Sequence, residues 1–372
     1  MASNASADDN TLFVVQPEKI TPGRRRMGRA LVWSTFLLML AAALVQALHV
    51  EGVIGYGFDN WRPLLYAYCL WACAIAFSRV LIFGESGKRS LFVLPAVMFI
   101  VAIVFFPLLF GLYVSFTDWN LSSLEGRKFN GLDNLRQMAG DPYYWNALTN
   151  MVYYVLAIIV EYSIAFGLAL LLNSEIRARK FFRVAFLLPL MMSPIAVSWM
   201  IGKSMLEIRF GPIARFARWL GWESPTFFSS PEIAKFTIMV LDAWTYIPLM
   251  MLMLLAGLQA MPKEVLEAAK VDGAGPWKSF WEIVFPIMLP VSVTAVLIRI
   301  IFKLKLADII IAVTAGGPGG ATDSITSFIF REYRDRSNVG YGTLLAFVYL
   351  IIIILFMTAL IRFVSRWLDR PA

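Results

Sequence analysis

Long runs of apolar residues dominate this sequence, and shorter polar segments separate them. Within each run the apolar residues are continuous rather than alternating, which favours helices over the strands of a β-barrel. Eight runs reach or approach the roughly 20 residues that a helix needs to cross a membrane. They cover residues 30–50, 61–83, 91–116, 146–173, 184–205, 235–258, 287–313 and 341–364. The pattern predicts an all-α integral membrane protein with about eight transmembrane helices.

The composition agrees with this class. Hydrophobic residues make up 59% of the 372 residues, charged residues make up only 16%, and the mean hydropathy is +0.69. Soluble domains carry about 25% charged residues. The polar residues 1–28 predict a disordered tail, whereas the run 30–50 is too long for a cleaved signal peptide and predicts a retained helix. We expect two helices within 29–89 and six helices within 90–372.

The basic residues between the spans predict the orientation of the chain. Loops rich in lysine and arginine stay in the cytoplasm, and here every second loop is basic. The basic residues are Arg24, Arg25, Arg26 and Arg29, then Lys88 and Arg89, Arg177, Arg179, Lys180 and Arg183, Lys263, Lys270 and Lys278, and finally Arg362, Arg366 and Arg370. Both termini are therefore expected in the cytoplasm. The net charge of +8 follows from this topology, so a nucleic-acid partner is not needed to explain it.

Several residues that could carry chemistry fit structural roles better. Cys69 and Cys73 lie one turn apart in one span, where packing is a commoner role than metal binding. His49 is the single histidine, so a histidine-based metal or catalytic site is not expected. The segment 84–90 departs from the spacing of a phosphate-binding loop, and 316–320 indicates a turn. The sequence predicts neither an enzyme nor a metal or cofactor bound by this chain.

The charged segment 259–286 between the sixth and seventh spans differs from the other loops. Pro262 can open a short helix because its missing N–H is not needed there, and Asp272-Gly273 indicates the turn that ends it. The apolar residues Trp277, Phe280, Trp281 and Ile283 predict a second short helix, which Phe285-Pro286 would end. The segment is either an amphipathic surface helix or a pair of helices that present a rigid surface to a cytoplasmic protein.

Charges inside the predicted spans mark a second region of interest, because each costs about 2.5–3.5 kcal/mol at the bilayer centre. Arg299 and Lys303 fall one turn apart on one helix face, so they cannot neutralise each other. Asp242 and Glu161 are the available counter-charges, and Tyr154 shares a face with Glu161. On a helix that continues to residue 313, Lys305 and Asp308 would pair at i,i+3 spacing on another face.

The loop segment carries a recognisable motif. Glu267-Ala268-Ala269, then Gly273, Ile283 and Phe285-Pro286 resemble the EAA motif of binding-protein-dependent ABC importer permeases, with Phe285 where leucine is usual. The flanking residues resemble the carbohydrate branch and its maltose-type first permease subunit; they are Phe182-Arg183, Leu188-Pro189, Trp199, Asp242-Ala243-Trp244, Pro248, Gln259, Pro262, Glu264, Val313 to Pro318, and Ala321-Thr322. The resemblance covers roughly residues 90–366, a six-helix type I permease core that follows two extra helices.

This resemblance implies a mechanism and partners. In the family the EAA loop fits into a cleft of a separate cytoplasmic ATPase, which binds the ATP and magnesium. The implied ATPase-coupling residues are Glu264, Glu267, Ala268, Ala269, Asp272 and Gly273. A second permease subunit, two ATPase subunits and a periplasmic or extracellular solute-binding protein would complete the importer. The implied location is the bacterial cytoplasmic membrane, with the chain crossing it several times.

The resemblance also implies a substrate site. Asp242, Trp244, Arg299 and Lys303 match positions that line the sugar pocket of the maltose-type subunit, where all but the tryptophan are neutral and polar; Tyr154 and Glu161 complete the candidate set. The two cations lead to the hypothesis of an acidic sugar. The alternatives are an internal salt bridge of Arg299 with Asp242 or Glu161, a glycerol-phosphate or polyol substrate, and an ion-coupled secondary transporter with Glu161 and Asp242 as its relay.

Overall fold

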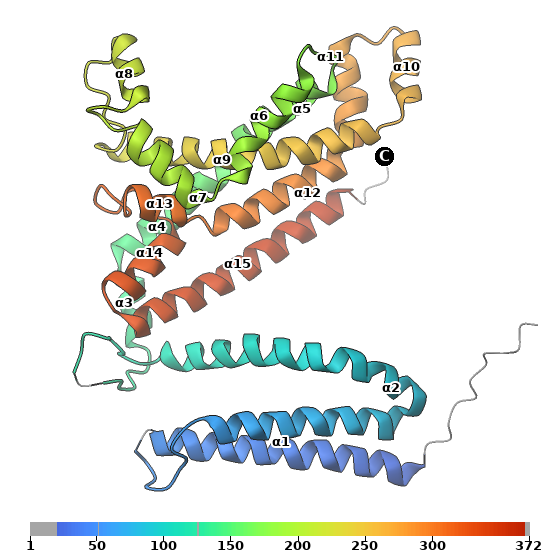
Figure 1. Ribbon diagram of the computed structural model, residues 1–372, viewed down its shortest axis with the longest axis vertical. Helices are drawn as coiled ribbons and strands as arrows, with labels where there is room; N and C mark the ends of the chain where they lie inside the picture. Colours follow the sequence, from blue (N-terminus) through green and yellow to red (C-terminus); the bar gives the residue numbers. More distant parts are fainter. Residues whose placement is uncertain (1–20, 51, 125, 369–372) are drawn as a thin grey trace, which may run out of the picture. The chain divides into compact units, whose positions relative to one another are not determined.

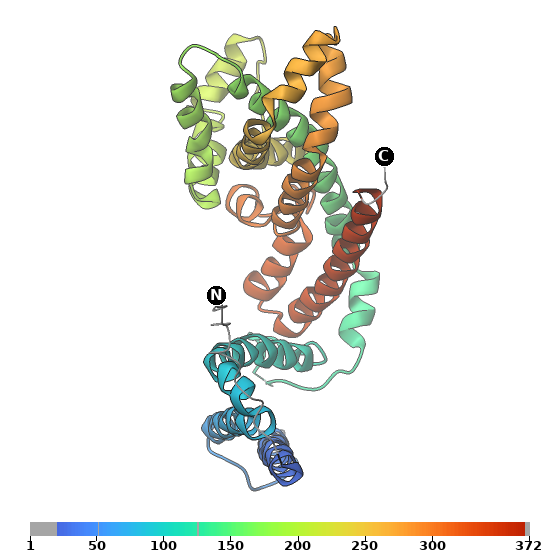
Figure 2. The ribbon, with the colours of Figure 1, turned by 90° about the vertical axis from the view of Figure 1, so that its right-hand side faces the viewer.

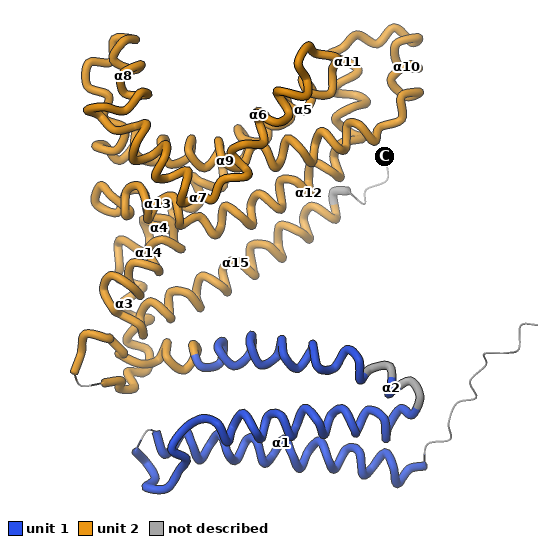
Figure 3. Tube along the Cα trace, in the orientation of Figure 1, with its two compact units in different colours: residues 1–110 blue, residues 111–372 orange. Residues whose placement is uncertain are grey.

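The computed structural model describes residues 21–50, 52–124 and 126–368, so most of the predicted disordered tail and Arg370 lie outside it. The described part falls into two units, residues up to 110 and residues from 111 onward (Figure 3). Among the described residues, seven helices are long and apolar enough to cross a membrane, and one strongly bent helix pair has the composition of an eighth span. The predicted all-helical membrane class is confirmed.

The first unit contains α1 (Pro22–Val50) and most of α2 (Arg62–Val114). α1 begins at Pro22 rather than near residue 30. α2 folds back on itself at Gly84, which divides it into the spans Arg62–Gly84 and Leu91–Val114 (Figure 1). Gly84 has φ 57° and ψ −127°, a conformation that residues with a Cβ atom rarely adopt. This glycine therefore permits the reversal between the second and third predicted spans.

The second unit holds the remaining helices. The segments are α3 (Asp133–Gly140), α4 (Pro142–Leu156), α5 (Ile158–Asn173), α6 (Arg179–Met191), α7 (Pro194–Val197), η1 (Ser198–Met205), α8 (Pro212–Trp219), α9 (Pro231–Ala260), α10 (Lys263–Val271), α11 (Pro276–Ser279), η2 (Phe280–Val284), α12 (Phe285–Leu304), α13 (Asp308–Val313), α14 (Ile325–Phe330), η3 (Arg331–Asp335) and α15 (Val339–Leu368). α9 contacts α5, α6 and α12, and Figure 2 shows it nearly end-on among its neighbours. It is the central helix of this unit.

The predicted span 184–205 is a broken helix. α6 and the segment Pro194–Met205 meet at an angle of 99°, so a single straight helix is wrong here. Pro194 has no N–H to continue the hydrogen-bond ladder of α6. Ser193 caps the new helix instead, because its side chain accepts a hydrogen bond from the Ala196 N–H at 3.2 Å.

The predicted span 287–313 is also two helices, since α12 ends at Leu304 and α13 starts at Asp308. The break releases backbone carbonyls inside the membrane, and these need other donors. The Tyr349 hydroxyl donates to the Leu304 carbonyl at 2.7 Å, and the Ser324 hydroxyl donates to that of Leu306. The predicted Lys305–Asp308 pair was wrong: no ion pair joins them in the described chain, because the helix that would align them ends first.

The second helix of the segment 259–286 does not end at Phe285-Pro286 as predicted. It runs from α11 through the π-helical turn η2 into α12, as one helix from Pro276 to Leu304. Pro286 lacks an N–H and its ring crowds the preceding turn. The wider π turn just before it accommodates the proline without ending the helix.

The basic segments of the second unit gather at one end. Figure 1 places the α5–α6 connection, α10, α11 and the end of α15 together, with α3, α8, α13 and α14 at the opposite end. The loops that the sequence showed to be basic therefore lie at one end of this unit. The side of the membrane that each end faces remains a prediction.

We predict that Lys270 on α10 is cytoplasmic and that Arg215 on α8 faces the other side. In a chain with Cys69→Ala and Cys73→Ala, Lys270→Cys should resist a membrane-impermeant maleimide in spheroplasts and react after permeabilisation. Arg215→Cys should react in both preparations, because both side chains are exposed. Labelling of Lys270→Cys in intact spheroplasts would show that the orientation is the opposite of the predicted one.

Candidate functional site

Four charged side chains meet inside the second unit. Arg299 and Lys303 come from α12, Glu161 from α5 and Asp242 from α9. All four are buried, with at most 3% of each side chain exposed. The structure therefore brings together four of the six predicted substrate-site residues. We call this group the charge cluster.

Each carboxylate of the charge cluster contacts both cations. Glu161 accepts from Arg299 Nε through Oε2 and from Lys303 Nζ through Oε1, at 2.7 Å each. Asp242 Oδ2 accepts from Arg299 Nη2 and from Lys303 Nζ. Two positive and two negative charges cancel, so the cluster as a whole is neutral. The internal salt bridge that the sequence suggested for Arg299 is confirmed, with both carboxylates as partners.

Tyr246 completes the surroundings of Arg299, although the sequence analysis did not identify it. The guanidinium carbon of Arg299 lies 4.6 Å from the centre of the Tyr246 ring, a cation–π contact. Tyr246 also stacks on Phe302 at 5.5 Å between ring centres. Its place one helical turn after Asp242 was the signal available in the sequence. Arg299 Nη1 is buried without a hydrogen-bond partner among the described residues.

Tyr154 belongs to a polar stripe on α4 that holds the glycine-rich segment 314–323. The Tyr154 hydroxyl donates to the Thr322 carbonyl at 2.7 Å, and Asn150 donates to the carbonyls of Ala321 and Asp323 at 2.7 and 3.0 Å. Asn146 donates to the Gly320 carbonyl at 2.7 Å. The two asparagines were missed, although residues 146, 150 and 154 share one helix face.

The glycine-rich segment is also held by its own side chains. Thr314 and Thr322 join their hydroxyls at 2.8 Å, and Thr322 donates to the Gly317 carbonyl at 2.9 Å. A Cβ atom on Gly316 would lie 2.3 Å from Asp323 Oδ1, and its φ is +83°, so only glycine fits there. Burial raises the pKa of the Asp323 carboxyl, while the adjacent Arg331 guanidinium acts to lower it. The segment is a tightly bonded loop at the end of unit 2 opposite α10.

Trp244, the remaining predicted site residue, joins neither the charge cluster nor the polar stripe on α4. It lies two residues after Asp242 on α9, about 200° around the helix, and 39% of it is exposed. It therefore points away from the charge cluster. Its exposed aromatic face remains available to a molecule outside this chain.

The predicted coupling residues lie on α10 and the turn after it. Glu264, Glu267, Ala268, Asp272 and Gly273 are exposed, whereas Ala269 is buried. Leu266 packs α10 against the core of the unit. Gly273 has φ +76°, and a Cβ atom there would meet no neighbour within 4 Å. Val271 and Trp277 are 88% and 75% exposed. This end of the unit presents acidic and apolar side chains around an open glycine.

The described residues contain no group of three or more histidine, cysteine, aspartate or glutamate side chains with the geometry of a metal site.

Comparison with known proteins places these features in a family context. Residues 82–370 match the family model described as "Binding-protein-dependent transport system inner membrane component". The sulfoquinovosyl glycerol transport system permease protein SmoG of Agrobacterium fabrum is 32% identical over 268 residues, which cover 71% of this chain and 87% of SmoG. The trehalose/maltose transport system permease protein MalF of Thermococcus litoralis is 28% identical over 275 residues, 74% of this chain and 92% of MalF.

A solved structure shares the fold. It is a bacterial ABC transporter involved in the import of the acidic polysaccharide alginate, with a TM-score of 0.64 and 18% sequence identity. The similarity covers 82% of this chain and 98% of that chain. The helix arrangement is therefore shared with a chain of that transporter.

We predict that removing one cation from the charge cluster destabilises the protein strongly. Arg299→Met leaves two buried carboxylates with one lysine, and breaking a buried pair costs about 3–5 kcal/mol. The double variant Arg299→Met with Asp242→Asn restores neutrality, so it should lose less stability than Arg299→Met alone. Thermal unfolding of the purified protein in detergent measures both.

Lys305→Met serves as the matched control, because Lys305 is exposed just beyond the end of α12. It should leave the unfolding temperature nearly unchanged. An equal loss in the single and double variants would show that charge balance is not what stabilises this region.

Proposed function

Because this chain belongs to the family of binding-protein-dependent transport system inner membrane components, we propose that it is the permease subunit of an ATP-driven importer for a carbohydrate. The observation that carries the proposal is the family match over residues 82–370. The sugar transport named for SmoG and MalF supports a carbohydrate as the solute. Relatives of this kind are transport components, so the chain contributes a pathway and not an enzymatic reaction.

The exposed surface of α10 supports a role in coupling to an ATPase. The side chains of Glu264 and Glu267 point to solvent, where they can pair with basic residues of a partner. Gly273 lets a partner approach the backbone closely, because no side chain covers it. Two cytoplasmic ATPase subunits would bind here and at the matching loop of a second permease, and closure of the ATPases would move both loops together. A solute-binding protein would deliver the carbohydrate at the opposite end.

The charge cluster supports an ABC importer better than an ion-coupled transporter. A proton or ion relay requires carboxylates that can release their partner during transport. Glu161 and Asp242 each contact both Arg299 and Lys303, so a relay would leave two buried cations without counter-charges. The cluster instead joins α5, α9 and α12 into one body that the coupling segment can move.

An acid-bearing carbohydrate is the second candidate for the solute. Arg299 Nη1 is buried with no partner in the described chain, so this arginine keeps one donor for an anion. The fold shared with an importer of the acidic polysaccharide alginate points the same way. An acidic group bound there would have to compete with Glu161 and Asp242 for the same cations.

We predict that Gly273→Asn uncouples transport while it preserves the fold. Asparagine tolerates positive φ, so the turn after α10 should form, but the new side chain would keep a partner from the backbone. Stimulation of ATP hydrolysis by the loaded binding protein should fall at least about tenfold, since 1.4 kcal/mol of lost binding corresponds to that factor. The reconstituted complex in lipid provides the measurement.

Gly221→Asn is the matched control. Gly221 has φ +97°, and a Cβ atom there would also meet nothing within 4 Å, but it lies next to α8, at the other end of the unit. It should leave ATP hydrolysis unchanged. Normal stimulation in Gly273→Asn would remove this glycine from the proposed contact.

We predict that solute-stimulated ATP hydrolysis identifies the solute class. Binding proteins loaded with neutral sugars, acidic sugars, polyols and glycerol phosphate are compared in the reconstituted complex. Stimulation by neutral sugars alone would show that Arg299 and Lys303 have a structural role and do not bind the solute. Stimulation by acidic sugars alone would support Arg299 and Lys303 as contacts of the solute. No stimulation by any carbohydrate would contradict the proposed function.

A further inference from the structure

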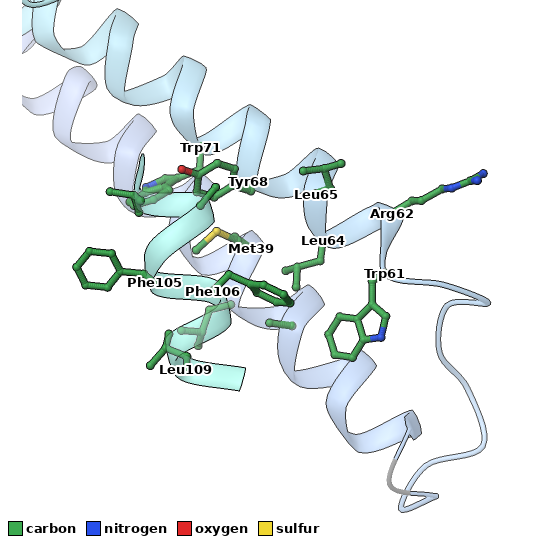
Figure 4. Close-up of a pocket in the computed structure, with 14 residues that line it drawn as sticks. Met39, Trp61, Arg62, Leu64, Leu65, Tyr68, Trp71, Phe105, Phe106 and Leu109 are labelled. Atoms are coloured by element: carbon green, nitrogen blue, oxygen red, sulfur yellow. The ribbon is translucent and has the colours of Figure 1, made fainter. Parts of the chain in front are cut away.

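An apolar groove of about 640 Å³ runs along the first unit. α1 contributes Met39, Leu40 and Ala43 to it. The two halves of α2 contribute the rest, including Trp61 just before α2, Leu65, Tyr68 and Trp71 from the first half and Phe105 and Phe106 from the second (Figure 4). The Tyr68 hydroxyl donates to the Met98 carbonyl and ties the two halves together. The groove therefore has walls from three helical segments.

The helices that form this groove are long and apolar enough to cross a membrane. The helices that form it have mean hydropathies of 2.1, 1.7 and 2.8 over their most apolar windows, and few of their side chains are buried within the chain. Lining of this kind gives water no hydrogen-bond partners. A volume in the range of about 300–1,000 Å³ is typical of a site for one small molecule. An apolar chain is the occupant that this lining fits.

The two ends of the groove differ in chemistry. Trp61 and Arg62 lie at one end, and Figure 4 shows the Arg62 side chain extending out of the groove there. Arg62 is exposed, and none of the described side chains forms an ion pair with it. Tryptophan and arginine are typical of the interface between hydrocarbon and headgroups. The open guanidinium is complementary to a phosphate at that level.

The length of the groove matches one leaflet. Arg62 and Trp71 are nine residues apart on α2, which corresponds to about 13 Å along a helix. Half of the hydrocarbon core is about 15 Å. A lipid whose headgroup lies at Arg62 would thus place its acyl chain along the groove as far as Trp71.

We propose that this groove binds one acyl chain of a glycerophospholipid whose phosphate pairs with Arg62. In the orientation predicted from the basic loops, Arg62 lies at the extracytoplasmic end of its span, so the lipid belongs to the outer leaflet of the cytoplasmic membrane. The bound lipid fills space between α1 and the two halves of α2. It also gives Arg62 a counter-charge, which none of the described side chains supplies.

Native mass spectrometry of the detergent-purified complex with added phosphatidylglycerol tests the proposal. The wild type should retain one phosphatidylglycerol more than Ala43→Phe, which fills the groove with a ring. Arg62→Gln should lower that retention roughly fivefold, as expected for one basic residue at the membrane surface. Arg79→Gln, an exposed arginine of the same helix outside the groove, should retain the lipid as the wild type does.

Bromine-labelled phosphatidylglycerol gives a second reading. It should quench the fluorescence of Trp71, which is obtained as the difference in fluorescence between the wild type and Trp71→Phe. The variant Ala43→Phe should abolish that quenching. Equal lipid retention in wild type and Ala43→Phe would overturn the groove as a lipid site. If Ala43→Phe lowers the retention of phosphatidylglycerol but Arg62→Gln does not, the phosphate contact with Arg62 would be overturned. A cross-link from Ala43→Cys to a protein helix, with no lipid retained, would assign the groove to a protein partner.

Discussion

The mutual neutralisation of two cations and two carboxylates is the constraint on which the second unit depends. An unpaired charge in a membrane helix is costly, so Arg299 and Lys303 cannot leave Glu161 and Asp242 without other partners. The four residues come from α5, α9 and α12, and their contacts fix the relative rotation of these helices. A buried ion pair adds little net stability compared with apolar residues of the same size, but removing one partner is strongly destabilising.

The break after α12 connects the charge cluster to the glycine-rich segment. Lys303 is followed at once by Leu304, whose carbonyl accepts hydrogen bonds from Tyr349 and Thr326. The chain then passes through α13 to Thr322, whose carbonyl is bonded to Tyr154 of α4. At its other end, α12 continues without a break into η2 and α11 beside the exposed turn at Gly273. One helix therefore joins the proposed coupling surface to the charge cluster and the loop opposite.

The sequence predicted what depends on composition and spacing. Continuous apolar runs predicted the membrane spans, and the EAA-like residues from Glu267 to Gly273 indicated the family. The one-turn spacing of Arg299 and Lys303 showed that they needed counter-charges. The breaks at Ser193-Pro194 and at Lys305 to Ala307 were not predicted, because apolar residues continue on both sides of each break and hydrophobicity alone does not show where a helix bends. The partners of Asn146 and Asn150 were missed because they are carbonyls more than 170 positions away, which no local pattern specifies.

The charge cluster is expected to stay intact throughout the transport cycle. A cryo-EM structure of the complete importer, trapped with ATP and with its solute bound, measures this most directly. The account predicts that Arg299 still contacts Glu161 and Asp242 in the trapped state, as in the present structure, and that the solute density lies elsewhere. Separation of Arg299 from both carboxylates, with solute density against its guanidinium, would contradict it.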